Sequence, residues 1–117
     1  MKAPYDPTTD FDPSKIYQQY IAAGHEWVDK NAAYQLLKEV KDTLRSTIEA
    51  RHLDADMSVA KAQTLAKADS MYIDHVKAMV EAQKAADWAR VNYDGAKVLA
   101  DMRRSQISFI KAQAEIL

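Results

Sequence analysis

Three histidines, and the aspartates beside one of them, are the residues whose types suit metal binding or proton transfer. His52 is followed by Asp54 and Asp56, and an imidazole with two carboxylates would supply part of a zinc site. A fourth ligand is missing, and aspartates in a turn commonly cap the next helix, so we interpret this stretch as a turn. His25 is expected to lie in solvent. His75 falls on an apolar helix face and is expected to be packed rather than to act as a base.

The motifs of the common enzyme classes are missing from the sequence. There is no cysteine for thiolate chemistry or disulfides, no glycine-rich phosphate loop, no nucleophile elbow and no paired-carboxylate arrangement. We therefore expect a protein without enzymatic activity, cofactor or bound metal.

A row of basic side chains is the pattern that suits nucleic-acid binding. It recurs at steps of six or seven residues: Lys77, Lys84, Arg90, Lys97 and Arg104. An acidic row (Asp87, Asp94 and Asp101) runs beside it, the net charge is −1, and aromatic residues for base stacking are not evident. Where the two rows overlap, the charges alternate in sign at helical spacing, which predicts a solvated helix face. Nucleic-acid binding through the basic row is therefore the alternative function.

Glycine and proline, which end helices, are scarce in the chain. There are two glycines, and all three prolines fall within residues 1–13. The 48% hydrophobic and 28% charged residues are typical of a globular domain. The composition predicts an all-α fold, with a mobile N-terminal arm over 1–12 and a single helical domain over 13–117. The alternative for the arm is a recognition segment anchored by Tyr5.

Four helices are expected, with a break at each of three places. The alternative at Asp69-Ser70 is a helix that continues through these residues. Gly24 is placed to end the first helix in the left-handed conformation, Asp54 or Asp56 to cap the third, and Asp69-Ser70 to start the last. The expected ranges are 13–24, 25–51, 57–68 and 70–116. No apolar run approaches the ~20 residues of a membrane span, and no signal-peptide segment is present, so we expect a cytoplasmic protein.

The last helix carries two apolar seams at heptad spacing on roughly opposite sides. The first seam is Leu65, Ala68, Tyr72, His75, Met79, Ala82, Ala86, Ala89, Tyr93, Ala96, Ala100, Arg103, Ile107, Ile110, Ala114 and Leu117. The second seam is Trp88, Val91, Gly95, Val98, Met102, Ser105, Phe109, Ala112 and Ile116. An ordinary surface helix buries one stripe, whereas this one needs neighbours on two sides. We therefore predict a helical hairpin or bundle with coiled-coil-like packing that forms a homodimer, the alternative being a monomer whose own helices fill both sides.

A family resemblance lies within this region. The run from Ala66 to Val76, continued by Val80 to Ala86 and by Arg103-Arg104, resembles small all-helical proteins encoded by tailed phages and prophages. The resemblance covers about residues 60–110. It implies a protein made in the cytoplasm of an infected bacterium, acting as a recombination accessory, an inhibitor of a host defence system or a virion assembly factor. It carries over no catalytic residue.

These patterns together predict a non-enzymatic protein–protein interaction module that binds a host or phage protein. Its dimer or partner interface is expected at Trp88, Val91, Tyr93, Gly95, Val98, Met102, Arg103 and Phe109. The alternatives are a nucleic-acid-binding or recombination accessory protein that uses the basic row, and a structural component of a virion.

Overall fold

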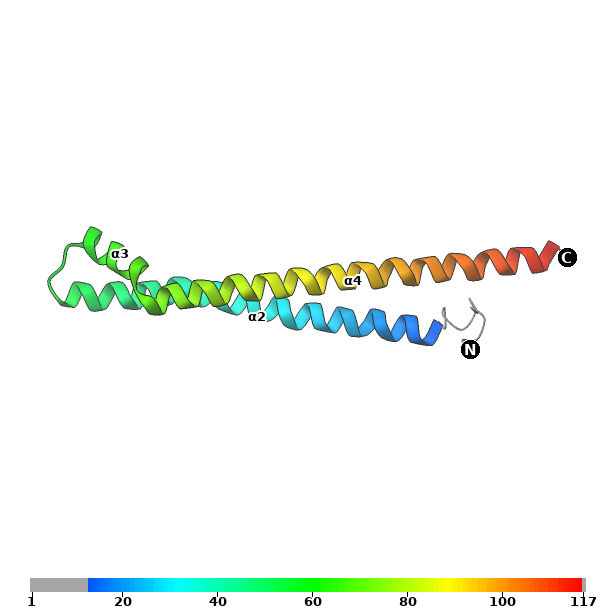
Figure 1. The fold of residues 1–117 in the computed structure, drawn as a ribbon, viewed down its shortest axis with the longest axis horizontal. Coiled ribbons are helices and arrows are strands. Elements are labelled where there is room, and N and C mark those ends of the chain that lie inside the picture. Colours follow the sequence, from blue (N-terminus) through cyan, green and yellow to red (C-terminus); the bar gives the residue numbers. More distant parts are fainter. Residues whose placement is uncertain (1–12, 117) are drawn as a thin grey trace, which may run out of the picture. The chain divides into compact units, whose positions relative to one another are not determined.

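The computed structural model describes residues 13–116 and consists there of three α-helices. They are α2 (Pro13–Asp54), α3 (Val59–Ala68) and α4 (Ser70–Ile116), drawn in Figure 1. The described residues contain no strand, so the prediction of an all-α fold is confirmed for them. The arm over 1–12, with Tyr5, lies outside the described residues.

Gly24 does not end a helix, and the prediction of separate helices over 13–24 and 25–51 is wrong. α2 passes through this position, and no glycine in the described part has a positive φ. The reason is a tertiary contact: a Cβ added at Gly24 would lie 3.2 Å from Cε2 of Tyr93. Gly24 therefore serves close approach between α2 and α4, which costs some helix propensity but leaves room for the ring.

The turn after α2 overlaps the predicted stretch 52–56, but the helix extends to Asp54 and the residue that caps α3 is different. The amides of Ala55 and Asp56 donate to the carbonyls of His52 and Leu53, both at 3.1 Å, which closes the end of the helix. The N-cap of α3 is Ser58, whose Oγ accepts from the amide of Lys61 at 3.2 Å. The prediction that Asp54 or Asp56 caps α3 is therefore wrong.

Asp56 adopts the left-handed backbone conformation that the turn after α2 requires. Its φ of 61° lies in the left-handed region, which Asp tolerates better than β-branched residues do. We expect Asp56→Val to lower the free energy of unfolding by about 1–2 kcal/mol, and Asp56→Gly to be neutral or to raise it by about 0.5 kcal/mol. Urea unfolding followed by circular dichroism measures both. Asp54→Val, two residues earlier in the helix, is the control, and an equal loss there would contradict a cause specific to the left-handed position.

The predicted break at Asp69 is confirmed. Asp69 adopts an extended conformation (φ −65°, ψ 135°) between α3 and α4. Its amide donates to the carbonyl of Ala66 at 3.2 Å, and its Oδ1 accepts from the amide of Met71 at 2.8 Å. One residue thus satisfies backbone groups of two helix ends, which is why Asp suits this position better than a helix interior.

The described residues belong to two compact units, and α2 and α4 contribute to both. The unit over 28–87 contains the second part of α2, all of α3 and the start of α4. Its most deeply buried side chains are Ile48, Ala62, Ala66 and Ala86. His75 is half-buried there, and its Nε2 donates to the carbonyl of Leu37 at 2.7 Å, which confirms the prediction that His75 is packed.

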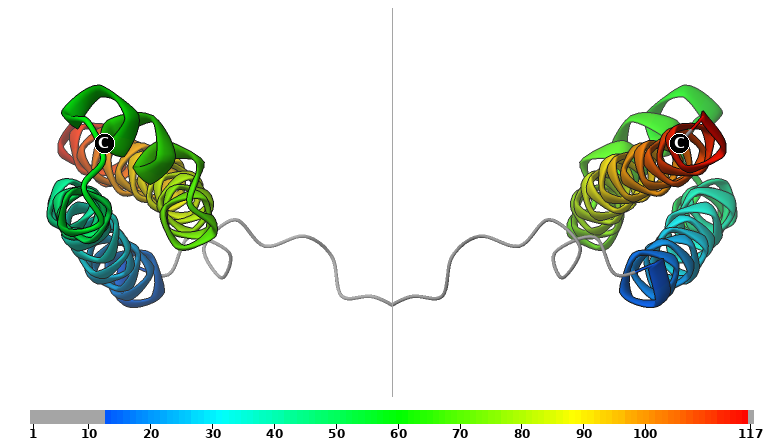
Figure 2. Two further views of the ribbon diagram at one scale, coloured as in Figure 1. Left: turned by 90° about the vertical axis from the view of Figure 1, so that its left-hand side faces the viewer. Right: turned by 90° about the vertical axis from the view of Figure 1, so that its right-hand side faces the viewer.

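The other unit pairs the start of α2, up to Trp27, with α4 from Trp88 onward. Within it these two helix segments lie side by side, as the end views of Figure 2 show. Its most deeply buried side chains are Ile16, Ala89 and Ala100. Alanines at these positions let the two helix backbones approach closely.

Candidate functional site

The first seam of α4 is used for packing within the chain. From Tyr72 to Ile107, each of its residues is buried or half-buried. In the unit that contains Trp88, this side of α4 faces the start of α2. The first seam is therefore occupied by contacts within each unit, and a surface for a partner has to be sought on the other sides of α4.

Tyr93, one of the predicted interface residues, lies in an aromatic cluster inside this unit. Its hydroxyl is 3.0 Å from that of Tyr20, and the two ring centroids are 5.2 Å apart. The Trp27 ring stacks on Tyr93 at 5.5 Å with an interplanar angle of 22°, and the guanidinium of Arg90 lies 5.9 Å from the Trp27 ring. The Tyr93 ring is thus engaged by α2. Sequence reasoning places Tyr20 in the apolar stripe at the start of α2, together with Ile16, but it does not single out Trp27 or bring either ring to Tyr93.

The hydrogen bond to Tyr93 raises the pKa of Tyr20, and burial adds to the effect. The Tyr20 hydroxyl therefore has a higher pKa in the folded chain than in the unfolded one, whose pKa is the ordinary 10.0. This difference stabilises the folded chain below pH 10, and the stabilisation is lost as the pH rises through the pKa of the folded state. We expect Tyr93→Phe to bring the pKa of Tyr20 back towards its ordinary value. Absorbance titration of tyrosinate, with Tyr20→Phe subtracted to isolate the group, measures the change. An unchanged Tyr20 titration in Tyr93→Phe would contradict the assigned cause.

Arg103, also predicted at the interface, lies in the first seam. Its side chain is half-buried, and its Nη1 donates to Oε1 of Gln106 at 3.4 Å. Its Nε is buried and has no hydrogen-bond partner among the described residues. The Arg103 side chain thus places its Nη1 at the surface and its Nε inside the unit.

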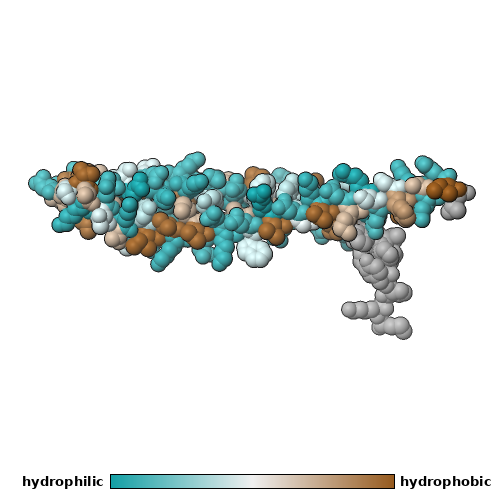
Figure 3. Space-filling model, turned by 90° about the horizontal axis from the view of Figure 1, so that it is seen from above, coloured by the Kyte–Doolittle hydropathy of each residue, from teal (hydrophilic) through white to brown (hydrophobic). Residues whose placement is uncertain are grey.

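The second seam is open to solvent along its whole length. Its five largest predicted interface side chains are each more than half exposed: Trp88 64%, Val91 59%, Val98 58%, Met102 55% and Phe109 63%. Gly95, in the middle, has no atom within 4 Å of the position that a Cβ would occupy. Apolar side chains are also visible at the surface in Figure 3, separated by hydrophilic ones.

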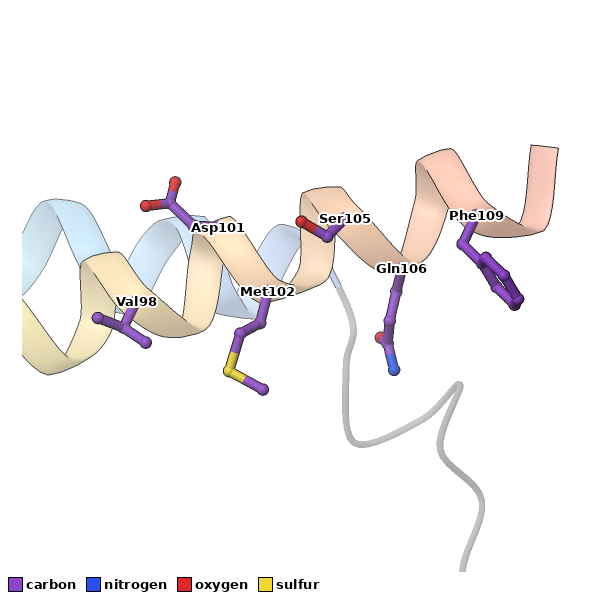
Figure 4. A pocket seen from close by; sticks show the side chains of 6 residues that line it. All are labelled: Val98, Asp101, Met102, Ser105, Gln106 and Phe109. Carbon is purple, nitrogen blue, oxygen red and sulfur yellow. The ribbon is translucent and has the colours of Figure 1, made fainter. Parts of the chain in front are cut away.

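A shallow groove of about 540 Å³ lies on this part of α4. It is lined by Val98, Asp101, Met102, Ser105, Gln106 and Phe109. Figure 4 shows Val98, Met102 and Phe109 projecting from one edge of the helix, while Asp101 points away from that edge. The lining is mostly apolar and offers no cluster of groups for acid–base work, so the groove suits an apolar side chain of a partner.

The last turns of α4 continue this open surface. Every residue from Ser108 to Ile116 is exposed, including Phe109 and Ile110. A helical stretch of this length gains little stability by itself, because most helical stability in proteins comes from packing. The apolar side chains at this end are therefore left without cover in the isolated chain.

The charged face of α4 is solvated, as the alternating rows predicted. All six residues from Asp87 to Arg104 in these rows are exposed, and Arg90 pairs with Asp94 at 4.0 Å. Lys77 and Lys84, in the other unit, are exposed as well. Since exposed ion pairs contribute about 0–1 kcal/mol, this face supports the helix only weakly. Basic and acidic side chains alternate on it, so it presents no continuous positive surface.

The remaining candidates for chemistry lie apart from one another. His25 is exposed as predicted, and His52 is half-buried at the end of α2. Within residues 13–116, no group of three or more His, Cys, Asp or Glu side chains is arranged to hold a metal ion. In the same part of the chain, no helix combines the length and apolarity needed to cross a membrane.

In comparisons with known proteins, no family model, no curated protein and no solved structure matches the chain.

Proposed function

We propose that this protein acts by binding another protein through the second seam of α4, without catalysing a reaction. The observation that carries the proposal is the row of five large apolar side chains, each more than half exposed, along one side of a helix. Large exposed apolar side chains that gather along one side of a helix are typical of an interaction site. A long helix with an open apolar stripe is a common way to bind another helix.

Side-chain composition favours protein binding over nucleic-acid binding. Trp88, Met102 and Phe109 are of the types enriched at the centres of protein interfaces. The basic row, by contrast, is interleaved with exposed carboxylates at Asp87, Asp94 and Asp101, which weaken its attraction for phosphate. The seam therefore offers a larger gain in free energy on binding than the charged face does.

The resemblance to phage-encoded helical proteins guides the choice of partner. We propose a protein of the infected bacterium or of the phage itself, and an inhibitor of a host defence system fits a small chain that binds through one exposed face. The partner surface would present a complementary apolar groove or helix.

Site-specific photo-crosslinking tests this proposal. A photoreactive phenylalanine analogue is placed at Met102 in the seam and, as a matched control, at Lys97 on the charged face. Both positions are exposed on α4. We expect a defined protein other than a second copy of the chain to be captured from Met102 and not from Lys97. We further expect the purified partner to bind the unmodified chain and to lose about 100-fold in affinity for Met102→Glu, because a charge would be buried at the contact.

Two further variants separate the alternatives. The charge reversal Lys97→Glu with Arg104→Glu should leave the affinity for the partner unchanged, since both residues lie on the charged face, outside the seam. A loss of binding in this double variant, together with normal binding by Met102→Glu, would overturn the proposal in favour of the basic row.

A further inference from the structure

We infer that the second seam pairs with the same seam of a second copy of this chain, with the two α4 helices antiparallel. This inference rests on the proposed function, in that it uses the same surface, and it names one occupant of that surface. The seam divides into two rows, at the a and d positions of a heptad. The a positions are Trp88, Gly95, Met102, Phe109 and Ile116, and the d positions are Val91, Val98, Ser105 and Ala112.

Side-chain size decides the direction of pairing. Apart from Gly95, the a positions carry the large side chains and the d positions carry the small ones. In an antiparallel pair each a residue lies opposite a d residue of the other helix, so large side chains meet small ones. In a parallel pair Trp88 would meet Trp88 and Gly95 would meet Gly95, which overfills one layer and leaves the next a layer empty. Packed interiors tolerate neither.

One antiparallel register pairs all the seam residues from Trp88 to Ala112. It pairs Trp88 with Ala112, Val91 with Phe109, Gly95 with Ser105, and Val98 with Met102, each pair joining one copy to the other. The smallest layer, Gly95 with Ser105, is where the two backbones approach most closely, and Gly95 has open space for this. In this register Lys84 faces Ile116 at the end of the helix, whereas a shift by one heptad would set Lys84 against Phe109, inside the seam. In the chosen register, the segment of α4 from Trp88 onward, which belongs to one compact unit, pairs with the same segment of the second copy.

The area that such a pair buries is enough for a modest dimer. A fully buried aromatic side chain covers about 150–250 Å², so the exposed parts of Trp88, Met102 and Phe109 with the valines provide about 1,000 Å² over both copies. This is near the lower end of the size range for specific interfaces.

Acidic side chains beside the seam should make the affinity of the dimer depend on the salt concentration. In this register Asp101 lies beside Asp101 of the second copy, and Asp87 lies beside Glu115. Exposed carboxylates repel one another weakly, and salt screens the repulsion. Self-association should therefore become tighter as the salt concentration rises, whereas binding to nucleic acid becomes weaker. Replacing Asp101 with Asn should likewise tighten the dimer several-fold.

Disulfide mapping in the full-length chain tests direction and register, because the chain has no cysteine of its own. Val91→Cys and Phe109→Cys are made separately, one with a tag that changes its mass, and are mixed and oxidised. Both positions are exposed, so each variant should keep the helical circular dichroism of the parent. We expect the mixed disulfide between the two variants to dominate, and Lys97→Cys, on the charged face, to stay reduced.

Each other outcome overturns a definite part of the inference. Disulfides between two Val91→Cys chains and between two Phe109→Cys chains would show a parallel pair. A mixed disulfide of Val91→Cys with Met102→Cys would show the register shifted by a heptad. Sedimentation equilibrium between about 50 and 500 mM NaCl completes the test, and a monomer throughout would exclude the second copy. That last result would leave the proposed function standing with a different partner, whereas dimerisation without any captured protein would overturn the proposed function alone.

Discussion

Removing the Tyr93 side chain is expected to lower the free energy of unfolding by about 3 kcal/mol, because truncation of a packed aromatic side chain costs about 3–5 kcal/mol and this one is only half-buried. The ring joins α4 to α2 through Tyr20 and Trp27, at centroid distances of 5.2 and 5.5 Å. The unit around it has few deeply buried side chains apart from Ile16 and two alanines. The loss of Tyr93 therefore leaves these two helix segments with little to hold them together.

Chemical unfolding followed by tryptophan fluorescence measures this effect directly, since both Trp27 and Trp88 belong to the same unit as Tyr93. Trp88→Ala is the matched control, because it removes an aromatic side chain of the same helix that is 64% exposed. Measured at low protein concentration, the control should lose less than about 1 kcal/mol. Equal losses in the two variants would show that the aromatic cluster does not hold the unit together.

Substitutions at Gly24 and at Tyr93 are expected to be coupled, because the two residues are in contact. In the parent chain, a methyl group at Gly24 meets Tyr93 Cε2 at 3.2 Å, so Gly24→Ala gains helix propensity and loses ring packing. With Tyr93→Ala the obstacle is gone, and Gly24→Ala should then stabilise the chain by about 1 kcal/mol. A double-mutant cycle should therefore show a coupling energy between the two positions. Strict additivity would contradict the contact.

The same contact explains why part of the fold was predictable from the sequence and part was not. The start of α4 could be predicted because it depends on local capping chemistry at Asp69. The helix end that was predicted at Gly24 is wrong, because glycine ends a helix when it adopts a positive φ but can also make room for a neighbouring side chain. The neighbour here is Tyr93, far along the sequence. Periodicity within one helix contains no information on which distant ring will pack there.

The candidate site was likewise predictable from the sequence only in part. Heptad spacing separated the two seams of α4, and the structure confirms that the first is packed between Tyr72 and Ile107. Spacing alone could not decide which predicted interface residues stay open. Tyr93 and Arg103 point into the unit, whereas Trp88 and Met102 remain exposed. The difference depends on where α2 lies, and this follows from contacts between helices rather than from either helix alone.

Replacing Ile48 with alanine should also lower the free energy of unfolding by about 3 kcal/mol, because the core of its unit contains few large buried side chains. Ile48 is 2% exposed, and the other most deeply buried side chains of residues 28–87 are alanines. Truncating it leaves a cavity that alanines are too short to fill, and such cavities add to the lost transfer free energy. Ile48→Val, which removes one methyl group, should cost about 1 kcal/mol.

Leu36→Ala on the same helix provides the control for Ile48→Ala. Leu36 is 62% exposed, so its truncation forms no cavity, and alanine is at least as good a helix former. We expect the urea midpoint from circular dichroism to fall for Ile48→Ala and to stay within experimental scatter for Leu36→Ala. A drop of similar size in both variants would contradict the assignment of the loss to the burial of Ile48, because Leu36 has no buried side chain to lose. The stability of this unit therefore depends on a single large side chain, whereas the exposed apolar residues on the same helix contribute little to it.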